Sequence, residues 1–338
     1  MIKNRSRALD VFRGLSVAFM ILINNPGIWS SVYDPFEHSS WHGLSAADVV
    51  FPFFLFAIGN ALSFSNPSVQ KILKRGVLIF IIGLFLNWSP FLKSWEEVRV
   101  MGVLQRIALS YVSAGMLIKY FRDHVLKISF GILILYWILC VVFGTGDIYS
   151  LEGWFGTPID RMILGTFDPE GIVSTMGAIS LVMLGFWAGV YFKNFYKIGI
   201  TSVLIAFGLK YLQPFNTKIW TSTYTLMCFG IAMLILGMLV QYFDEKKAEG
   251  RWAKVFEAFG KNPLFIYVLS TFIPDASVLI KIPEGDGFVT PLQWFYSHVC
   301  AYFPGRLENG SLFYSFILLA LYGMLALWLD RKRIYIKV

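Results

Sequence analysis

One stretch of the chain, residues 34–60, combines side chains suited to acid–base chemistry with a strongly apolar run. It carries two histidines, His38 and His42, and an aspartate, Asp48, four residues before Pro52. Histidine is the usual general base near neutral pH, and a neighbouring carboxylate fixes its tautomer. Proline lacks a backbone N–H, so in a helix Pro52 would leave the carbonyl of Asp48 without its usual donor. This stretch is therefore our first candidate for a reactive site.

Asp48 also has a structural explanation, and the sequence leaves both open. If a helix starts near Gly43, Asp48 lies roughly one turn inside a membrane helix. An ionisable group at that depth is costly and marks a functional site by default. At the helix end it would instead be an acid in interfacial water.

Polar residues in the first apolar run are the next candidates. Asp10 and Arg13 are spaced i and i+3 on one helix face, either as a snorkelling surface pair or as a basic group for an anionic ligand. Asn24 is the last polar residue before the breaker cluster Asn-Pro-Gly, so we expect it at the same side of the membrane as Asp48.

Arg106 lies about one turn into another apolar run, where it needs an acid, a carbonyl or a ligand. Asp48 and Glu170 are candidate partners. Asp168 followed by Pro169 predicts a helix start, which explains Asp168 by capping and leaves Glu170 unexplained.

Lys261 and Asn262 precede Pro263 at a predicted helix start, where anions bind well. A lysine that only snorkels to the interface is the alternative.

Composition sets the class of protein that must position these residues. The 338 residues are 57% hydrophobic and 15% charged, with a mean hydropathy of +0.63. The apolar runs are far longer than the ~10-residue strands of a membrane barrel. We therefore predict an all-α, polytopic helical membrane protein with one transmembrane domain, 1–338. Ten spans are expected, near 8–26, 44–64, 74–92, 101–121, 128–146, 172–192, 196–212, 222–242, 255–273 and 311–329; residues 291–303 are too short to span.

The net charge of +8 does not indicate nucleic-acid binding, because the basic residues gather in loops between apolar runs. Most of them fall on the side that holds both termini, which predicts cytoplasmic termini. The first helix is expected to be retained rather than cleaved. The three cysteines have neither disulfide nor metal-ligand spacing.

Several segments together resemble the heparan-α-glucosaminide N-acetyltransferase family and its bacterial relatives. In the family's order, from residue 7 to 268, they are RALDVFRGL, NNPG, EHSSWHGLSAADVVFPFFLF, GVLQRIALSY, DPEGIVSTMGAIS and GKNPLFIYV. The resemblance implies a membrane acyltransferase that takes acetyl from cytosolic acetyl-CoA and delivers it to a sugar across the membrane. It also implies a bacterial cytoplasmic membrane location and a homodimer.

Carried over by position, the resemblance makes His38 catalytic, with Asn24 and Asp48 beside it. Arg13, Arg106, Glu170 and Asn262 match other polar positions of the family. We expect the acceptor side to be formed by Trp41, His42, Arg106 and Glu170, and the acetyl-CoA side by Asp10, Arg13, Lys261 and Asn262. The lysosomal member of the family has asparagine at the position of His42, and it has an N-terminal extension and a first helix that find no match here. With the short loops, these differences lead us to expect a bacterial relative with an acceptor other than heparan sulfate.

These residues fit acyl transfer, which needs a base and an oxyanion donor; the amide of Asn24 can be that donor. Direct transfer and an acetylated His38 both remain open. A transporter of a small anionic or sugar substrate is the alternative function. A metal site is a weaker alternative, because His38 and His42 are spaced i and i+4 but a helix there is doubtful.

Overall fold

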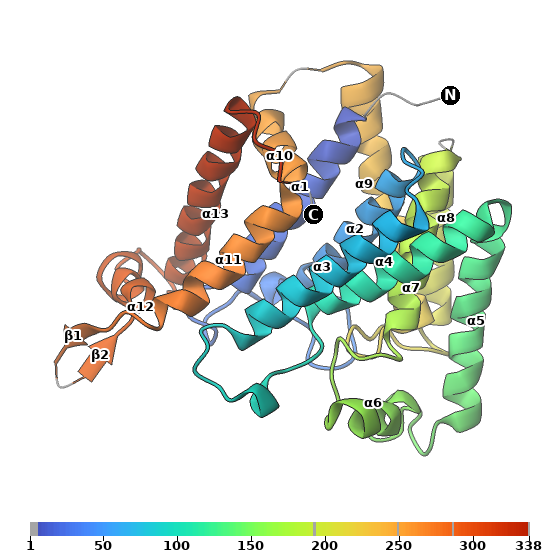
Figure 1. Ribbon diagram of the computed structural model, residues 1–338, viewed down its shortest axis with the longest axis horizontal. Coiled ribbons are helices and arrows are strands. Elements are labelled where there is room, and N and C mark those ends of the chain that lie inside the picture. Colours follow the sequence, from blue (N-terminus) through green and yellow to red (C-terminus); the bar gives the residue numbers. More distant parts are fainter. Residues whose placement is uncertain (1–5, 192–193, 249, 286, 337–338) are drawn as a thin grey trace.

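The computed structural model describes residues 6–191, 194–248, 250–285 and 287–336, which form a mostly helical bundle (Figure 1). Thirteen α-helices occur in these ranges, joined by short 3-10 and π turns. They are α1 (Arg7–Asn24), α2 (Ala46–Leu62), α3 (Val69–Trp88), α4 (Val103–Tyr120), α5 (Val125–Phe143), α6 (Gly156–Leu164), α7 (Thr175–Val190), α8 (Phe195–Leu209), α9 (Ser222–Leu239), α10 (Arg251–Lys261), α11 (Pro263–Ser277), α12 (Pro291–Phe295) and α13 (Leu307–Arg331).

All but one of the ten predicted spans correspond to a single helix. The exception is 255–273, which is divided between α10 and α11 at Asn262, so the prediction of one continuous helix there is wrong. Pro263 is the first residue of α11, and Asn262 before it leaves the helical conformation (φ −128°, ψ 44°). The last residue of the predicted span 172–192 lies outside the described residues.

Two elements were not predicted. The first is α6, a nine-residue helix too short for a span. The second is an antiparallel hairpin of β1 (Ile282–Glu284) and β2 (Gly287–Val289), in which Pro283 is paired with Phe288. It departs from the all-α expectation only locally. The segment 291–303 is, as expected, too short to span and contains α12 followed by a π turn, Tyr296–Cys300.

Three helical stretches are long and apolar enough to cross a membrane: Arg122–Phe143, Ser222–Glu245 and Leu307–Arg331. In α5 one face exposes large apolar side chains at helical spacing, namely Phe130, Ile134, Ile138 and Val141. A helix that leaves such a face unpacked fits a hydrocarbon environment. The structure thus supports a membrane protein, while ten crossings stay a prediction.

The helix that carries Asp48, α2, is held by a close contact with α7. A Cβ added to Gly59 would lie 1.8 Å from the carbonyl oxygen of Val182, and one added to Gly185 would lie 2.2 Å from that of Phe56. Glycines at facing positions let two membrane helices approach to backbone contact. Larger residues at either position would push α2 away from α7.

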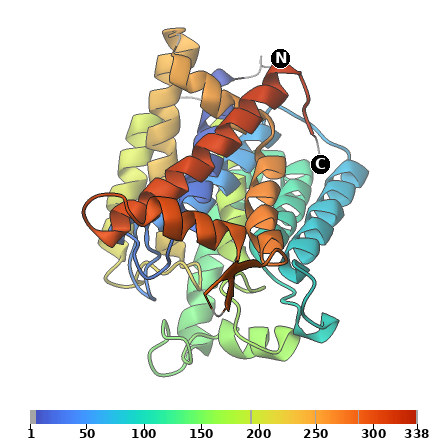
Figure 2. The ribbon, with the colours of Figure 1, turned by 90° about the vertical axis from the view of Figure 1, so that its left-hand side faces the viewer.

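The start of α1 and the end of α13 lie at the same end of the bundle, whereas α6 lies at the opposite end (Figures 1 and 2). This arrangement agrees with an even number of crossings. Which end faces the cytoplasm stays a prediction.

Candidate active site

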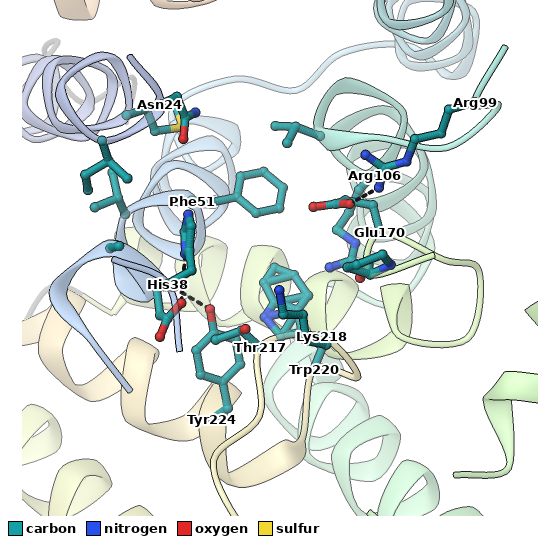
Figure 3. Close-up of a pocket in the computed structure, with 17 residues that line it drawn as sticks. Asn24, His38, Phe51, Arg99, Arg106, Glu170, Thr217, Lys218, Trp220 and Tyr224 are labelled. Carbon is teal, nitrogen blue, oxygen red and sulfur yellow. Dashed lines mark hydrogen bonds and ion pairs between the residues drawn. The ribbon is translucent and has the colours of Figure 1, made fainter. Parts of the chain in front are cut away.

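A cavity of about 300 Å³ lies where the end of α1 meets the starts of α2 and α4. Five of the predicted site residues line it: Asn24, His38, Asp48, Arg106 and Glu170. Asn24 and His38 lie on one side, and Arg106 and Glu170 lie on the other (Figure 3). The structure therefore brings together residues that are up to 146 positions apart in the sequence.

His38 and Asp48 form a pair in this cavity. Nδ1 of His38 lies 2.8 Å from Oδ1 of Asp48. The carboxylate is fully buried, whereas the imidazole is 48% exposed. The pair fixes Nδ1 toward the acid and leaves Nε2 as the nitrogen available for proton transfer.

The same carboxylate begins α2. Oδ2 of Asp48 accepts hydrogen bonds from the backbone N–H of Ser45 (2.9 Å) and from the hydroxyl of Ser39 (2.7 Å). Ser45 caps α2 in return, so the two residues form a capping box. The helix starts at Ala46 rather than near Gly43, which puts Asp48 in the first turn and not a full turn inside.

The backbone carbonyl of Asp48 is not left unpaired by Pro52. The hydroxyl of Tyr224 in α9 donates a hydrogen bond of 2.5 Å to it. Pro52 does remove the usual helical donor, as predicted, and the hydroxyl of Tyr224 replaces it, which was not predicted.

Arg106 is buried, and of the expected kinds of partner, namely an acid, a carbonyl or a ligand, it has a backbone carbonyl. It donates to the carbonyl of Pro169 (2.5 Å) and to the hydroxyl of Ser174, and its guanidinium lies 4.7 Å from the ring centre of Trp220. Among the described residues neither Asp48 nor Glu170 forms an ion pair with it. The expected ion pair is thus replaced by hydrogen bonds and a cation–π contact.

Arg99 forms ion pairs with both acidic residues of the turn before α7, Asp168 and Glu170. It forms a two-pronged pair with Asp168 (2.7 and 2.6 Å) and a further contact with Glu170. Burial opposes ionisation of Asp168, but the Arg99 pair outweighs it and lowers the pKa of Asp168. Asp168 does not cap α7, which starts only at Thr175; its carboxylate accepts instead from the N–H of Glu170 (2.8 Å).

Trp41 and His42 lie outside the residues that line the cavity. The indole N–H of Trp41 donates to the carbonyl of Tyr149 (2.8 Å), and Nδ1 of His42 lies 3.5 Å from Nδ2 of Asn216. Both residues dock the loop that holds His38 onto neighbouring loops. Their role in acceptor binding stays a prediction.

The loop before α9 forms a wall of the cavity that was not predicted from the sequence. The side-chain carbonyl of Asn216 accepts from the N–H groups of Lys218 (2.8 Å) and Ile219 (3.1 Å), which closes a tight turn. Lys218 and Trp220 then line the cavity. Trp220 has φ +52°, a strained conformation of the kind found at functional sites. The polar and aromatic run before the span at 222–242 was the available signal.

Two further cavities continue along α4. One of about 160 Å³ is lined by Arg13, Arg75 and Tyr111, and one of about 280 Å³ is lined by Lys119 and Arg122. Val103 and Arg106 line the first cavity, so successive turns of α4 pass all three in order. The third cavity therefore lies at the end of α4 that is farthest from His38.

The residues predicted to hold acetyl-CoA divide into two groups. Arg13 pairs with Asp10 (2.6 Å), donates to the carbonyl of Gly260 (2.7 Å) and lines the second cavity. The side chains of Arg13 and Asp10 are 21% and 8% exposed, so the pair is largely buried and is not a surface pair. Lys261 and Asn262 instead bind the C-terminal segment: Lys261 pairs with the carboxylate of Asp330 (2.8 Å), and the amide of Asn262 donates to the carbonyl of Ile334 (2.9 Å).

In the part of the chain that the structure describes, no group of three or more histidine, cysteine, aspartate or glutamate side chains is arranged to hold a metal. Residues 38–42 are not helical, so His38 and His42 do not share a helix face.

The first half of the chain matches a known family. Residues 5–154 match the family described as heparan-alpha-glucosaminide N-acetyltransferase, catalytic. Two proteins of that name are similar to this chain: that of Mus musculus is 28% identical over 355 aligned positions, and that of Homo sapiens is 26% identical over 357. Both alignments cover 78% of this chain, which spans about half the length of these relatives (53% and 52%). The matched segment holds the His38–Asp48 pair and Arg106, so it is in this part that the chain is similar to the heparan-alpha-glucosaminide N-acetyltransferase family.

Proposed function

We propose that the protein is a membrane acetyltransferase that moves the acetyl group of acetyl-CoA to an amine or hydroxyl of a sugar or glycan acceptor. The observation that carries this proposal is the His38–Asp48 pair, whose half-exposed imidazole opens into the cavity lined by Asn24 and Arg106. The match of residues 5–154 to the catalytic family model, and the similarity to two N-acetyltransferases, support acetyl transfer as the chemistry.

In the proposed reaction, Nε2 of His38 accepts the proton of the attacking amine or hydroxyl. The acceptor forms a bond to the acetyl carbon, the C–S bond breaks, and the CoA thiolate leaves with the proton from the imidazolium. Asp48 stabilises the imidazolium through Nδ1. The side-chain amide of Asn24 donates a hydrogen bond to the oxyanion. In the two-step alternative, Nε2 of His38 forms a bond to the acetyl carbon and the CoA thiolate leaves. The acceptor then attacks the acetyl carbon, the bond to Nε2 breaks, and the acceptor's proton passes through the freed Nε2 to the thiolate.

The row of cavities along α4 supports entry of acetyl-CoA from the end opposite His38. From Val103 to Lys119 the helix rises about 24 Å, at 1.5 Å per residue. The extended pantetheine arm would lie along this row with the phosphates near Arg75, Lys119 and Arg122. Arg13 lines the second cavity, between the first and the third. Lys261 and Asn262 would act only indirectly, through the C-terminal segment that they bind.

The proposed topology is ten crossings of one transmembrane domain, residues 1–338, with both termini cytoplasmic. The pair α10 and α11 would form one broken crossing. The acetyl group then reaches an acceptor on the far side of a bacterial cytoplasmic membrane without the carrier crossing. A homodimer is proposed on family resemblance alone.

The direct test uses purified protein in nanodiscs, acetyl-CoA labelled in the acetyl group, and a panel of amino sugars and cell-envelope glycans. We expect label on at least one acceptor and release of CoA, both lost in His38→Ala. Uptake of a sugar or anion into proteoliposomes, without acetyl-CoA turnover, would establish the transporter alternative instead.

A further inference from the structure

At the start of α2, the backbone carbonyl of Asp48 and the side-chain hydroxyl of Tyr224 are both buried and form a hydrogen bond with each other. Pro52 cannot donate to the carbonyl of Asp48, which is the bond that a helix would form there. The hydroxyl of Tyr224, from α9, is 2.5 Å from that carbonyl and donates to it. Tyr224 is 2% exposed and Asp48 is 3% exposed, so water does not substitute for this bond.

This bond fixes the main chain of Asp48. The carboxylate of Asp48 contacts His38 and Ser45, while its backbone carbonyl accepts from Tyr224 of α9. The residue is therefore fixed at both its side chain and its main chain. Such two-sided support is what keeps a reactive group within a few tenths of an ångström of its working position.

Tyr224 also connects Asp48 to the far wall of the cavity. Its ring lies 5.8 Å from that of Trp220, which stacks on Phe51 of α2 (5.7 Å) and carries the guanidinium of Arg106. A movement of α9 would therefore displace residues on both walls of the cavity, Asp48 on one side and Arg106 on the other.

We infer that Tyr224 is a positioning residue that acts through the carbonyl freed by Pro52, and that the two residues form a matched pair. Pro52 leaves the backbone carbonyl of Asp48 without a helical donor, and the hydroxyl of Tyr224 donates to it. This bond keeps the first turn of α2 in the position that aligns Oδ1 of Asp48 with His38. The inference that this alignment serves acetyl transfer rests on the proposed function; the pairing itself does not.

A double-mutant cycle tests the inference. Tyr224→Phe removes the hydroxyl and keeps the ring, and we expect kcat to fall about tenfold with the KM for acetyl-CoA unchanged. Pro52→Ala supplies the missing N–H, so in that background Tyr224→Phe should lower kcat by less than about threefold. Equal losses in the two backgrounds would overturn the matched pair.

The control is Tyr322→Phe, which removes another hydrogen bond from a buried tyrosine hydroxyl to a carbonyl, that of Leu269 (3.3 Å), away from the cavity. We expect it to lower the Tm by roughly 2–4 °C without lowering kcat. A fall in kcat as large as that of Tyr224→Phe would mean that Tyr224 has only a general structural role.

The same cycle measured by thermal unfolding does not depend on activity. Tyr224→Phe should lower the Tm in the parent and much less in the Pro52→Ala background, even if no acetyl transfer is found. In that case the pairing stands and the proposed function fails. Pro52→Val also restores the N–H and serves if Pro52→Ala does not fold.

Discussion

Asp48 holds His38 with one carboxylate oxygen and the start of α2 with the other. Oδ1 lies 2.8 Å from Nδ1 of the histidine, and Oδ2 accepts from Ser45, the residue that caps the helix. A reactive pair is thus built on a helix cap, and substitutions of Asp48 will change both activity and stability.

The first prediction distinguishes the two histidines. His38→Ala should lower single-turnover acetyl transfer by at least ~10²-fold, the usual cost of losing a general base. Acetyl-CoA should still bind, because its phosphates are proposed to lie at the other end of α4. His42 contacts Asn216 outside the cavity, so His42→Asn should keep most of the activity. Active His38→Ala protein would show that we chose the wrong histidine.

The second prediction separates orientation from capping. Asp48→Asn offers an amide to Nδ1 and favours the wrong tautomer of His38, so transfer should fall by roughly tenfold or more, though less than in His38→Ala. Ser45→Ala removes the cap and should cost about 1 kcal/mol of stability. Its transfer rate should change little. A Ser45→Ala protein as inactive as Asp48→Asn would mean that capping alone explains Asp48.

Local patterns explain what could be predicted from the sequence. Long apolar runs predict most of the helices, and His38 and Asp48 lie ten residues apart around one helix start, so their proximity follows from local geometry. Pro263 predicts the helix start that the structure shows at α11, although the predicted span 255–273 runs through it as one apolar run.

Contacts between distant segments explain what was missed. Tyr224 meets Asp48 across 176 residues, and Lys261 meets Asp330 across 69. No periodicity in either segment indicates such a partner. Arg106 illustrates the limit well: its need for a partner was evident, but a backbone carbonyl, that of Pro169, carries no sequence signal.

The third prediction concerns pH. Asp160 is fully buried, and its carboxylate accepts from the N–H of Ile172 (3.1 Å), in the turn that supplies Arg106 with its acceptors. Burial raises the pKa of Asp160 from 3.8 to about 6, despite that hydrogen bond and the charge of Arg106; the nearby Asp168 adds to the rise.

A raised pKa means that the folded protein holds this proton more strongly than the unfolded chain. The stability contributed by protonated Asp160 is therefore present below pH 4 and is lost as pH rises through about 6. Asp160→Asn mimics the protonated form. Relative to the parent, its stability should increase by about 2 kcal/mol between pH 4.5 and 7, measured by thermal unfolding in detergent. A constant difference across this range would show that Asp160 titrates normally.

The fourth prediction concerns the acetyl-CoA end. Arg13→Gln and Arg122→Gln should each weaken acetyl-CoA binding, because both residues line cavities along α4. The loss should shrink at high salt for the more exposed Arg122. Lys261→Gln should weaken binding less, because Asp330 already neutralises its charge. Isothermal titration with acetyl-CoA provides the measurement, and normal binding by both arginine variants would exclude this path.

The last prediction concerns orientation. Ser40 is exposed beside the His38–Asp48 pair, and Lys246 is exposed after α9; the native cysteines Cys140, Cys228 and Cys300 are all buried, so they should give little background. If both termini are cytoplasmic, Ser40→Cys should react with an impermeant thiol reagent added outside intact cells, and Lys246→Cys should react only after the cells are opened. Ser40 is preferable to Ser39, whose hydroxyl binds Asp48. The reverse pattern would place the His38 cavity on the cytoplasmic side, and acetyl transfer would then need no passage across the membrane.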